Sequence, residues 1–245
     1  MEELGLATNF VQTADQEPTG TAAVNADASG EAQFIISRPA AFDLLEVGSD
    51  LLEALHGANF DWLYFGTLMQ VESRIENYTG ELARILPQVR CFYDMNLRSG
   101  HWSFPLVQRL CGMASVLKLS EAEAKTIFAS AAGSGSAFCL EQFCSSWASK
   151  YDIAAICVTR GPGGCVVYAK GEMLECVGYP ITVCDTVGAG DAFAAAFLHG
   201  YHRAWPMERT LRFANALGAL VASRPGATPE WRAGEVNQIM AGQRV

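Results

Sequence analysis

The chain contains the stretch DTVGAGD at residues 185–191, which runs directly into an apolar helical sequence. Small residues just before such a run let successive backbone N–H groups converge at a helix N-terminus, where phosphate binds readily. Gly188, Ala189 and Gly190 are therefore a candidate anion cradle. Asp191 follows in the first expected helical turn, where its carboxylate could take a proton from a hydroxyl that attacks the bound phosphate. The stretch predicts a site of phosphoryl transfer.

The same residues have a structural interpretation and resemble two other phosphate-binding motifs. Most isolated strings of this kind form a glycine turn whose Asp caps a helix, and this structural alternative stays open at this point. A Walker A loop needs Lys and Ser or Thr after its glycines, and a dinucleotide-binding loop needs a third small residue where this chain has Phe193. Both motifs are excluded, so the phosphate would be held without a P-loop lysine.

Composition limits the class of protein. The chain has 245 residues, half of them hydrophobic, which suffices for one α/β domain with a large core. The net charge of -9 and the lack of a basic patch argue against nucleic-acid and anionic-membrane partners. The eight cysteines show no C-x-x-C spacing, no signal peptide is evident, and no uncharged apolar run reaches about 18 residues. We expect a cytoplasmic protein.

Helical and strand patterns alternate from residue 43 onward. We expect helices at 44–55, 75–86, 106–113, 122–129 and 137–150, and strands at 62–65, 90–94, 116–119 and 153–159. Tight turns at 160–164 and 170–172 lead to two further strands that should be antiparallel, and helices are expected at 189–201 and 207–223. Strands that alternate with helices of this length build a mostly parallel sheet covered on both faces. The pattern predicts an α/β fold, a three-layer α/β/α sandwich.

Residues 10–42 differ from the rest of the chain. Short β-prone pieces at 10–12, 21–25 and 33–37 are separated by turn signals that include Pro18-Thr19-Gly20. We interpret this segment as a small β lid on a single domain that spans residues 1–245.

Several motifs in a consistent order resemble the PfkB (ribokinase-like) carbohydrate kinases, in particular their fructokinase-like branch. Besides DTVGAGD, the matching stretches are PTG at 18–20, DMNLR at 94–98, KLSEAE at 118–123, VTRG at 158–161 and ANA at 214–216. The resemblance covers nearly the whole chain and implies a ribokinase-like sandwich that uses ATP and Mg²⁺. One departure is Ser120, which replaces the Asn that opens the family's Asn-x-x-Glu segment.

The resemblance also assigns roles near the reacting groups. Asp191 would be the base, and the amides of residues 188–190 would stabilise the transferring phosphoryl group. Glu123 would hold Mg²⁺ through water, unless it is a solvated residue on a helix face. Asn96 and Arg98 would contact the sugar or the transferred phosphate. The structural alternatives are that Asn96 only orders the loop after its strand and that Arg98 is a surface arginine.

Further roles concern the nucleotide and a second ion. Thr159, Gly161, Gly164 and Asn215 would line the nucleotide site by resemblance. Asp185, with carbonyl groups near residue 226, resembles the family's monovalent-cation site, which would take K⁺.

The beginning of the chain departs from the family pattern. The usual first strand, early sugar-binding Asp and Gly-Gly-x-x-x-Asn stretch have no counterpart, so Met1 would correspond to a point about 60 residues into a full-length member. Two hypotheses follow. The chain is an ATP-dependent kinase for a hydroxyl of fructose, a related hexose or a keto-sugar acid, whose carboxylate Arg38 could meet, or it is a truncated, catalytically impaired nucleotide-binding protein. A homodimer through the β lid is a further expectation.

Overall fold

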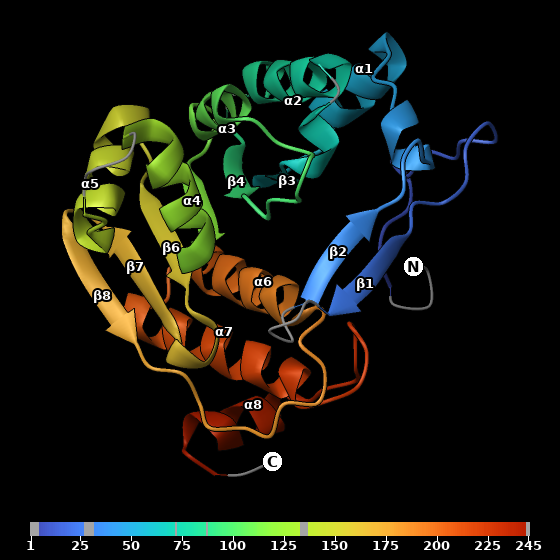
Figure 1. Cartoon of the computed structure of the whole chain (residues 1–245). Coiled ribbons are helices and arrows are strands. Elements are labelled where there is room, and N and C mark those ends of the chain that lie inside the picture. Colours follow the sequence, from blue (N-terminus) through green and yellow to red (C-terminus); the bar gives the residue numbers. More distant parts are fainter. Residues whose placement is uncertain (1–4, 27–31, 72, 87, 133–136, 244–245) are drawn as a thin grey trace. The chain divides into compact units, whose positions relative to one another are not determined.

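The computed structural model describes residues 5–26, 32–71, 73–86, 88–132 and 137–243. The chain divides into two compact units, Met1–Ala114 and Ser115–Val245 (Figure 1). That residues 1–245 form a single domain stays a prediction.

The first unit begins with the lid. Strands β1 (Ala22–Ala26) and β2 (Ala32–Ile36) pair antiparallel, close to the predicted strands at 21–25 and 33–37. The expected strand at 10–12 is wrong, since the described residues there form no strand. The Val11 N–H donates to the Thr8 carbonyl at 2.9 Å. This bond closes a turn, and a chain that turns back at this point cannot extend into a strand.

The rest of the first unit alternates helices and strands, as expected. Its elements are η2 (Ala41–Leu44), α1 (Ser49–Gly57), β3 (Trp62–Gly66), η3 (Leu68–Val71), α2 (Ser73–Ile85), β4 (Arg90–Asp94) and α3 (Phe104–Cys111). Strands β3 and β4 are parallel, and Phe65 stacks on its register partner Tyr93 with ring centroids 5.1 Å apart. The helix expected at 44–55 begins only at Ser49, because the Asp43 carboxylate accepts the Ala40 N–H and closes a separate turn first.

The second unit carries the predicted strand order. Its elements are β5 (Val116–Ser120), α4 (Glu121–Ala132), α5 (Leu140–Tyr151), β6 (Ala155–Thr159), η4 (Gly161–Gly163), β7 (Cys165–Ala169), β8 (Glu172–Cys176), α6 (Ala189–His202), α7 (Met207–Ala222) and α8 (Ala233–Met240). Strands β5 and β6 are parallel, whereas β7 and β8 continue antiparallel as expected. Helix α8 was not expected, because only Val236 and Ile239 mark its short buried face.

The strands of the second unit lie between two layers of helices. Helices α4 and α5 lie on one face, and α6 and α7 lie on the other (Figure 1). Helix α6 packs closely along α7, as two glycines show. A Cβ on Gly200 would approach Thr210 Oγ1 to 2.8 Å, and one on Gly218 would approach the Ala189 carbonyl to 3.2 Å. The core of the unit therefore fixes the first turn of α6.

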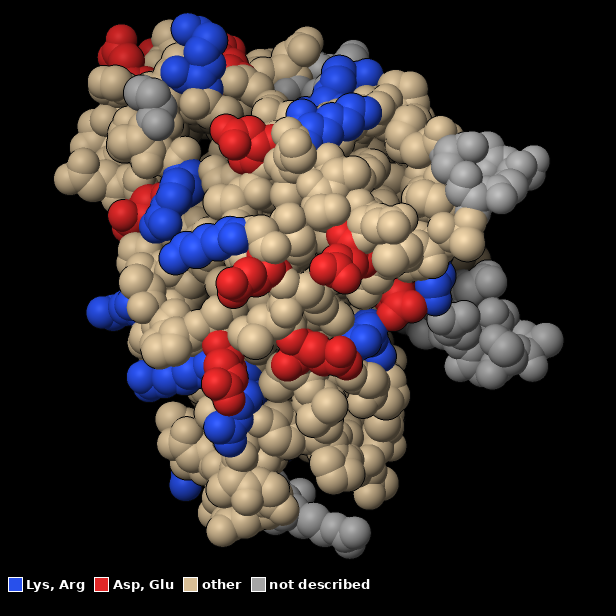
Figure 2. Space-filling view, turned by 90° about the vertical axis from the view of Figure 1, so that its left-hand side faces the viewer, with Lys and Arg blue, Asp and Glu red and all other residues tan. Residues whose placement is uncertain are grey.

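The surface charges and the lengths of the helices bear on possible partners. On the face shown in Figure 2, the Lys and Arg side chains of the described residues are interspersed with Asp and Glu. Among the described helices, none combines the length and the apolar character needed to cross a membrane.

Candidate active site

A hydrogen-bonded turn holds the DTVGAGD stretch against the end of α7. The N–H groups of Cys184 and Asp185 donate to the Ala222 carbonyl at 2.9 and 3.2 Å. The Asp185 carboxylate then accepts the Val187 N–H at 3.0 Å and the Gly226 N–H at 3.1 Å. Asp185 therefore ties its own turn to the loop that follows α7, and a carboxylate has further lone pairs available for a cation.

Gly188 brings the chain into α6 at a position where only glycine fits. It is the N-cap residue, with φ of +80°, and a Cβ there would lie 2.1 Å from the Ala227 carbonyl oxygen. L-residues with a side chain avoid this φ, and the contact leaves no room for a methyl group. The packing of residues 188 and 227 thus sets the direction of the first helical turn.

The first turn of α6 presents backbone donors. Among the described residues, the N–H groups of Gly188, Gly190 and Asp191 meet no acceptor, while the Ala189 N–H donates to the Thr186 carbonyl at 3.3 Å. Unsatisfied N–H groups at a helix N-terminus, together with the positive end of the helix dipole, form an anion-binding site. The Asp191 side chain in the same turn is exposed. A donor cradle and an accessible carboxylate therefore lie side by side.

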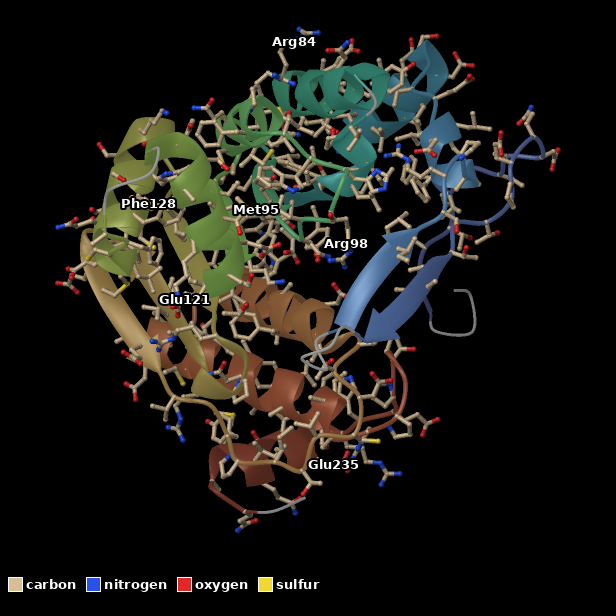
Figure 3. All side chains as sticks on the ribbon, in the orientation of Figure 1. Arg84, Met95, Arg98, Glu121, Phe128 and Glu235 are labelled. Atoms are coloured by element: carbon tan, nitrogen blue, oxygen red, sulfur yellow. The ribbon has the colours of Figure 1, made fainter. Side chains whose placement is uncertain are left out.

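Glu123 and Ser120 cap helix α4 reciprocally. Glu123 Oε2 accepts the Ser120 N–H at 2.7 Å and the Ser120 hydroxyl at 2.9 Å, and Ser120 Oγ accepts the Glu123 N–H at 3.2 Å. This is a capping box. The Ser-x-x-Glu spacing in the sequence is its signature, so this cap is a local feature of residues 120–123. Figure 3 labels Glu121, in the same helical turn as Glu123.

Glu123 is the residue for which the sequence predicts a magnesium role. Among the described residues, no group of three or more His, Cys, Asp or Glu side chains could enclose a metal. Mg²⁺ keeps several waters and is usually bound by one or two carboxylates together with substrate phosphates. A single carboxylate at the edge of the sheet fits this mode, in which Mg²⁺ would neutralise charge on the phosphates.

The turn after β6 forms a tight wall with the segment after β8. A Cβ on Gly164 would lie 2.1 Å from the Cys176 carbonyl oxygen, and one on Gly178 would lie 2.1 Å from the Pro162 carbonyl oxygen. Asn215, buried on α7, donates to the carbonyls of Cys176 and Val177 at 3.1 and 3.3 Å. Gly164 and Gly178 therefore let the two segments approach closely, and the Asn215 side-chain amide holds the second segment against α7.

The predicted nucleotide residues are close to this wall. Gly161 and Gly164 belong to the turn itself, and Asn215 braces the segment opposite. Thr159 ends β6 and is the register partner of Ser120 at the end of β5. The carboxyl ends of these parallel strands bring the predicted nucleotide and magnesium residues to one edge of the second unit.

Asn96 and Arg98 lie in the first unit, directly after β4. Asn96 has φ of +42°, a left-handed conformation that Asn adopts more readily than most residues. The buried Asp94 accepts the Tyr64 hydroxyl at 2.8 Å and anchors the strand end before them. Figure 3 labels Met95 and Arg98 in this segment.

Two thiols face each other on β7 and β8. Cys165 and Cys176 are register partners in the antiparallel pair, and Cys165 is buried. The hydrogen bond from the Cys165 thiol, with help from Asn215 and Arg212, lowers the pKa of Cys176 to about 6. The same hydrogen bond and burial raise the pKa of Cys165. No sequence motif marks this pair, because its residues are not closely spaced along the chain.

We expect Cys176 to be alkylated by iodoacetamide already at neutral pH, because the thiolate is the nucleophile and a lowered pKa keeps it populated. Its labelling rate should rise with a midpoint near pH 6, measured by peptide mass spectrometry across pH. In Cys165→Ala, which lacks the donating thiol, the midpoint should move up toward the ordinary thiol value of about 8.5. A wild-type midpoint already at that ordinary value would contradict the assignment.

Comparison with known proteins decides the family. The model of the pfkB family of carbohydrate kinases matches residues 1–233. Fructokinase from Escherichia coli is 30% identical over 237 residues, which cover 91% of this chain and 74% of the relative. The chain belongs to the pfkB family of carbohydrate kinases. Membership makes this kinase ATP-dependent, and its relatives place it in the fructokinase-like branch, as the sequence motifs predicted.

Solved structures confirm the predicted ribokinase-like α/β sandwich of this pfkB kinase. The structure of fructokinase with bound ATP from Xylella fastidiosa has a TM-score of 0.81 and 22% identity, covering 98% of this chain and 79% of that one. An E. coli protein described as a ribokinase II, in complex with ATP and Mg²⁺, has a TM-score of 0.76 and 20% identity, covering 92% of this chain and 72% of that one.

Proposed function

We propose that the protein transfers the terminal phosphoryl group of ATP to a hydroxyl of fructose or a related hexose, with Asp191 as the general base. The observation that carries this proposal is the start of α6. Three N–H donors that meet no acceptor in the part of the chain that the structure describes share one helical turn with the exposed Asp191 carboxylate. The donors would stabilise charge on the phosphoryl group, while the carboxylate would take the proton of the attacking hydroxyl. Fructose is favoured by the fructokinase relatives.

Arg38 supports a neutral sugar over a keto-sugar acid. Its guanidinium pairs with the Asp43 carboxylate, donates to the Leu68 carbonyl and lies over the Phe42 ring. An arginine already paired in this way would have to give up its partner to bind a substrate carboxylate, and that exchange costs free energy.

Two ions complete the proposal. Glu123 would hold Mg²⁺ through water beside the nucleotide phosphates, as its geometry and the ATP and Mg²⁺ complex of the E. coli relative suggest. Asp185 would contribute to a K⁺ site, for which the support is its carboxylate between residues 187 and 226. We also propose a cytoplasmic location, on the pattern of reduced thiols, and a homodimer through the β lid.

The alternative is a catalytically impaired nucleotide-binding protein. It is motivated by the nucleotide wall, whose contacts all lie within the second unit and need no sugar-binding residue. In that case the nucleotide wall at residues 159–164 would function while no sugar is turned over.

The test is ADP formation by the purified chain with Mg²⁺ and a panel of hexoses, keto-sugar acids and nucleosides. We expect turnover that depends on fructose or a related hexose. Calorimetric binding of ATP without turnover on any acceptor would instead support the impaired nucleotide-binding protein. Turnover only with a keto-sugar acid would overturn the argument from Arg38.

A further inference from the structure

Two cysteines lie opposite each other where β7 begins and β8 ends. Cys165 and Cys176 are register partners in this antiparallel pair of strands. Residues directly opposite each other send their side chains to the same face of a sheet, and their Cα atoms are about 4.5 or 5.5 Å apart. Disulfides join residues whose Cα atoms are about 4.4–6.8 Å apart. The strand pairing therefore holds the two thiols at a separation that a disulfide can span.

The two thiols differ in access and in charge. Cys165 is fully buried, whereas Cys176 is partly exposed and is followed by Val177, which is 72% exposed. The hydrogen bond from the Cys165 thiol lowers the pKa of Cys176 to about 6, so that a thiolate is populated at neutral pH. A small oxidant can reach this thiolate, and a second thiol lies beside it. Redox-sensitive cysteines are typically low-pKa, accessible thiols next to a resolving cysteine.

The cysteine pair adjoins the nucleotide wall. Cys165 directly follows Gly164 in the chain. A Cβ on Gly164 would lie 2.1 Å from the Cys176 carbonyl oxygen, and the same oxygen accepts the Asn215 side-chain amide at 3.1 Å. Both Gly164 and Asn215 are predicted nucleotide residues. A change in the spacing of β7 and β8 at this end must displace the wall, because the close contact at Gly164 leaves no free space.

We propose that Cys165 and Cys176 form a reversible disulfide when the protein meets hydrogen peroxide, and that this disulfide weakens nucleotide binding. The effect on binding rests on the proposed function, in which residues 159–164 and Asn215 contact the nucleotide. A sulfur–sulfur bond is about 2.05 Å long, shorter than any hydrogen-bonded contact between two thiols. It draws the two side chains together and displaces the turn at 161–164.

The oxidation balances in two steps. The Cys176 thiolate attacks one oxygen of the peroxide, so a sulfur–oxygen bond forms, the oxygen–oxygen bond breaks and hydroxide leaves. The Cys165 sulfur then attacks the sulfur of the resulting sulfenic acid. A sulfur–sulfur bond forms, the sulfur–oxygen bond breaks, and the leaving hydroxide takes the Cys165 proton and departs as water. The two thiols lose two electrons in total, and the peroxide is reduced to two molecules of water.

Oxidation of Cys176 also prepares Cys165 for the second step. The hydrogen bond to Cys176 is the largest cause of the raised pKa of Cys165, followed by burial. A sulfenic acid carries no negative charge to hold the Cys165 proton in place. The buried thiol therefore loses its proton more readily once its partner has been oxidised.

The test oxidises the purified full chain with hydrogen peroxide in the absence of nucleotide and sugar. Peptide mass spectrometry without reductant should find the peptides of Cys165 and Cys176 joined, and dithiothreitol should separate them again. In Cys165→Ala no such link can form, and dimedone should instead trap the sulfenic acid at Cys176. Cys176→Ser should also abolish the link, and it decides the question if Cys165→Ala does not fold.

Cys139→Ser is the matched control, because Cys139 is an exposed cysteine at the N-cap of α5, outside the sheet. It should leave the link between Cys165 and Cys176 intact. Stepwise oxidation of Cys176 to a sulfinic acid without this link would overturn the proposed pair. A disulfide that joins either cysteine to a different one would overturn it as well.

Calorimetry of ADP binding with Mg²⁺ then compares reduced and fully linked wild type. We expect the linked protein to bind ADP at least about fivefold more weakly, the lower end of ordinary coupling between two sites. Dithiothreitol should restore the affinity. Equal affinities of the reduced and the linked protein would overturn the effect on the nucleotide.

The disulfide and the proposed function fail in different ways. The link is detected without nucleotide or sugar, so it stands even if no sugar is phosphorylated. Sugar phosphorylation with unchanged ADP affinity after complete linkage would keep the kinase assignment and contradict the redox effect. Absence of ADP binding to the reduced protein would overturn the proposed function, and with it the effect on the nucleotide, but not the disulfide.

Discussion

Asp191→Asn is expected to lower kcat for sugar phosphorylation by about 10²- to 10⁴-fold, the usual contribution of a positioned general base. Asparagine keeps the size of the side chain but cannot take the proton of the attacking hydroxyl. The residue lies in the first turn of α6 and is exposed, so its removal leaves no buried cavity. Nucleotide affinity should therefore change little. A coupled ADP assay gives kcat, and calorimetry gives the dissociation constant of ADP.

Two further variants serve as controls for this result. Asp191→Ala should show the same loss and guards against a background rate from deamidated asparagine. Asp152→Asn is the matched control, because Asp152 is exposed at the end of α5 with φ of +55°, a conformation that asparagine tolerates. It should keep the wild-type rate. Wild-type turnover in both Asp191 variants would remove this residue from the mechanism.

The fold could largely be predicted from the sequence, because apolar strands and helices of ordinary length alternate in it. The strand at 90–94 and the two antiparallel strands after residue 164 follow directly from strand-forming runs and glycine turns. The misplaced strand at 10–12 was wrong because β propensity says nothing about a pairing partner. Helix α8 was missed because only two of its residues are buried, and two apolar positions are too few to reveal a helical period.

The candidate site could be predicted only where its residues are neighbours in sequence. The cradle and Asp191 occupy one continuous stretch, and the local rules for helix N-termini suffice for them. Other contacts join segments that are distant in the chain. Asn215 donates to the carbonyls of residues 176 and 177, and Lys118 lies close to Gly190. Such contacts depend on how helices and strands pack, and no local pattern encodes them.

Gly188→Ala is the substitution expected to disturb the cradle most. A left-handed φ of +80° costs a residue with a side chain about 1–2 kcal/mol. In addition, the new Cβ would stand 2.1 Å from the Ala227 carbonyl oxygen, so the backbone at one of the two positions must move. Overpacking of this kind typically adds about 1–3 kcal/mol. Both stability and binding of β,γ-methylene-ATP should fall, because the displaced turn no longer aims its N–H groups at one point.

Gly171→Ala separates strain from displacement. Gly171 has nearly the same φ, +83°, in the turn between β7 and β8, but a Cβ there meets nothing within 4 Å. It should lower the melting temperature by roughly 2–8 °C through backbone strain alone and leave nucleotide affinity unchanged. Gly188→Ala should melt lower still and bind the analogue more weakly. Equal melting temperatures in the two variants would mean that the loop at Ala227 yields freely, and the start of α6 would then not be held by this contact.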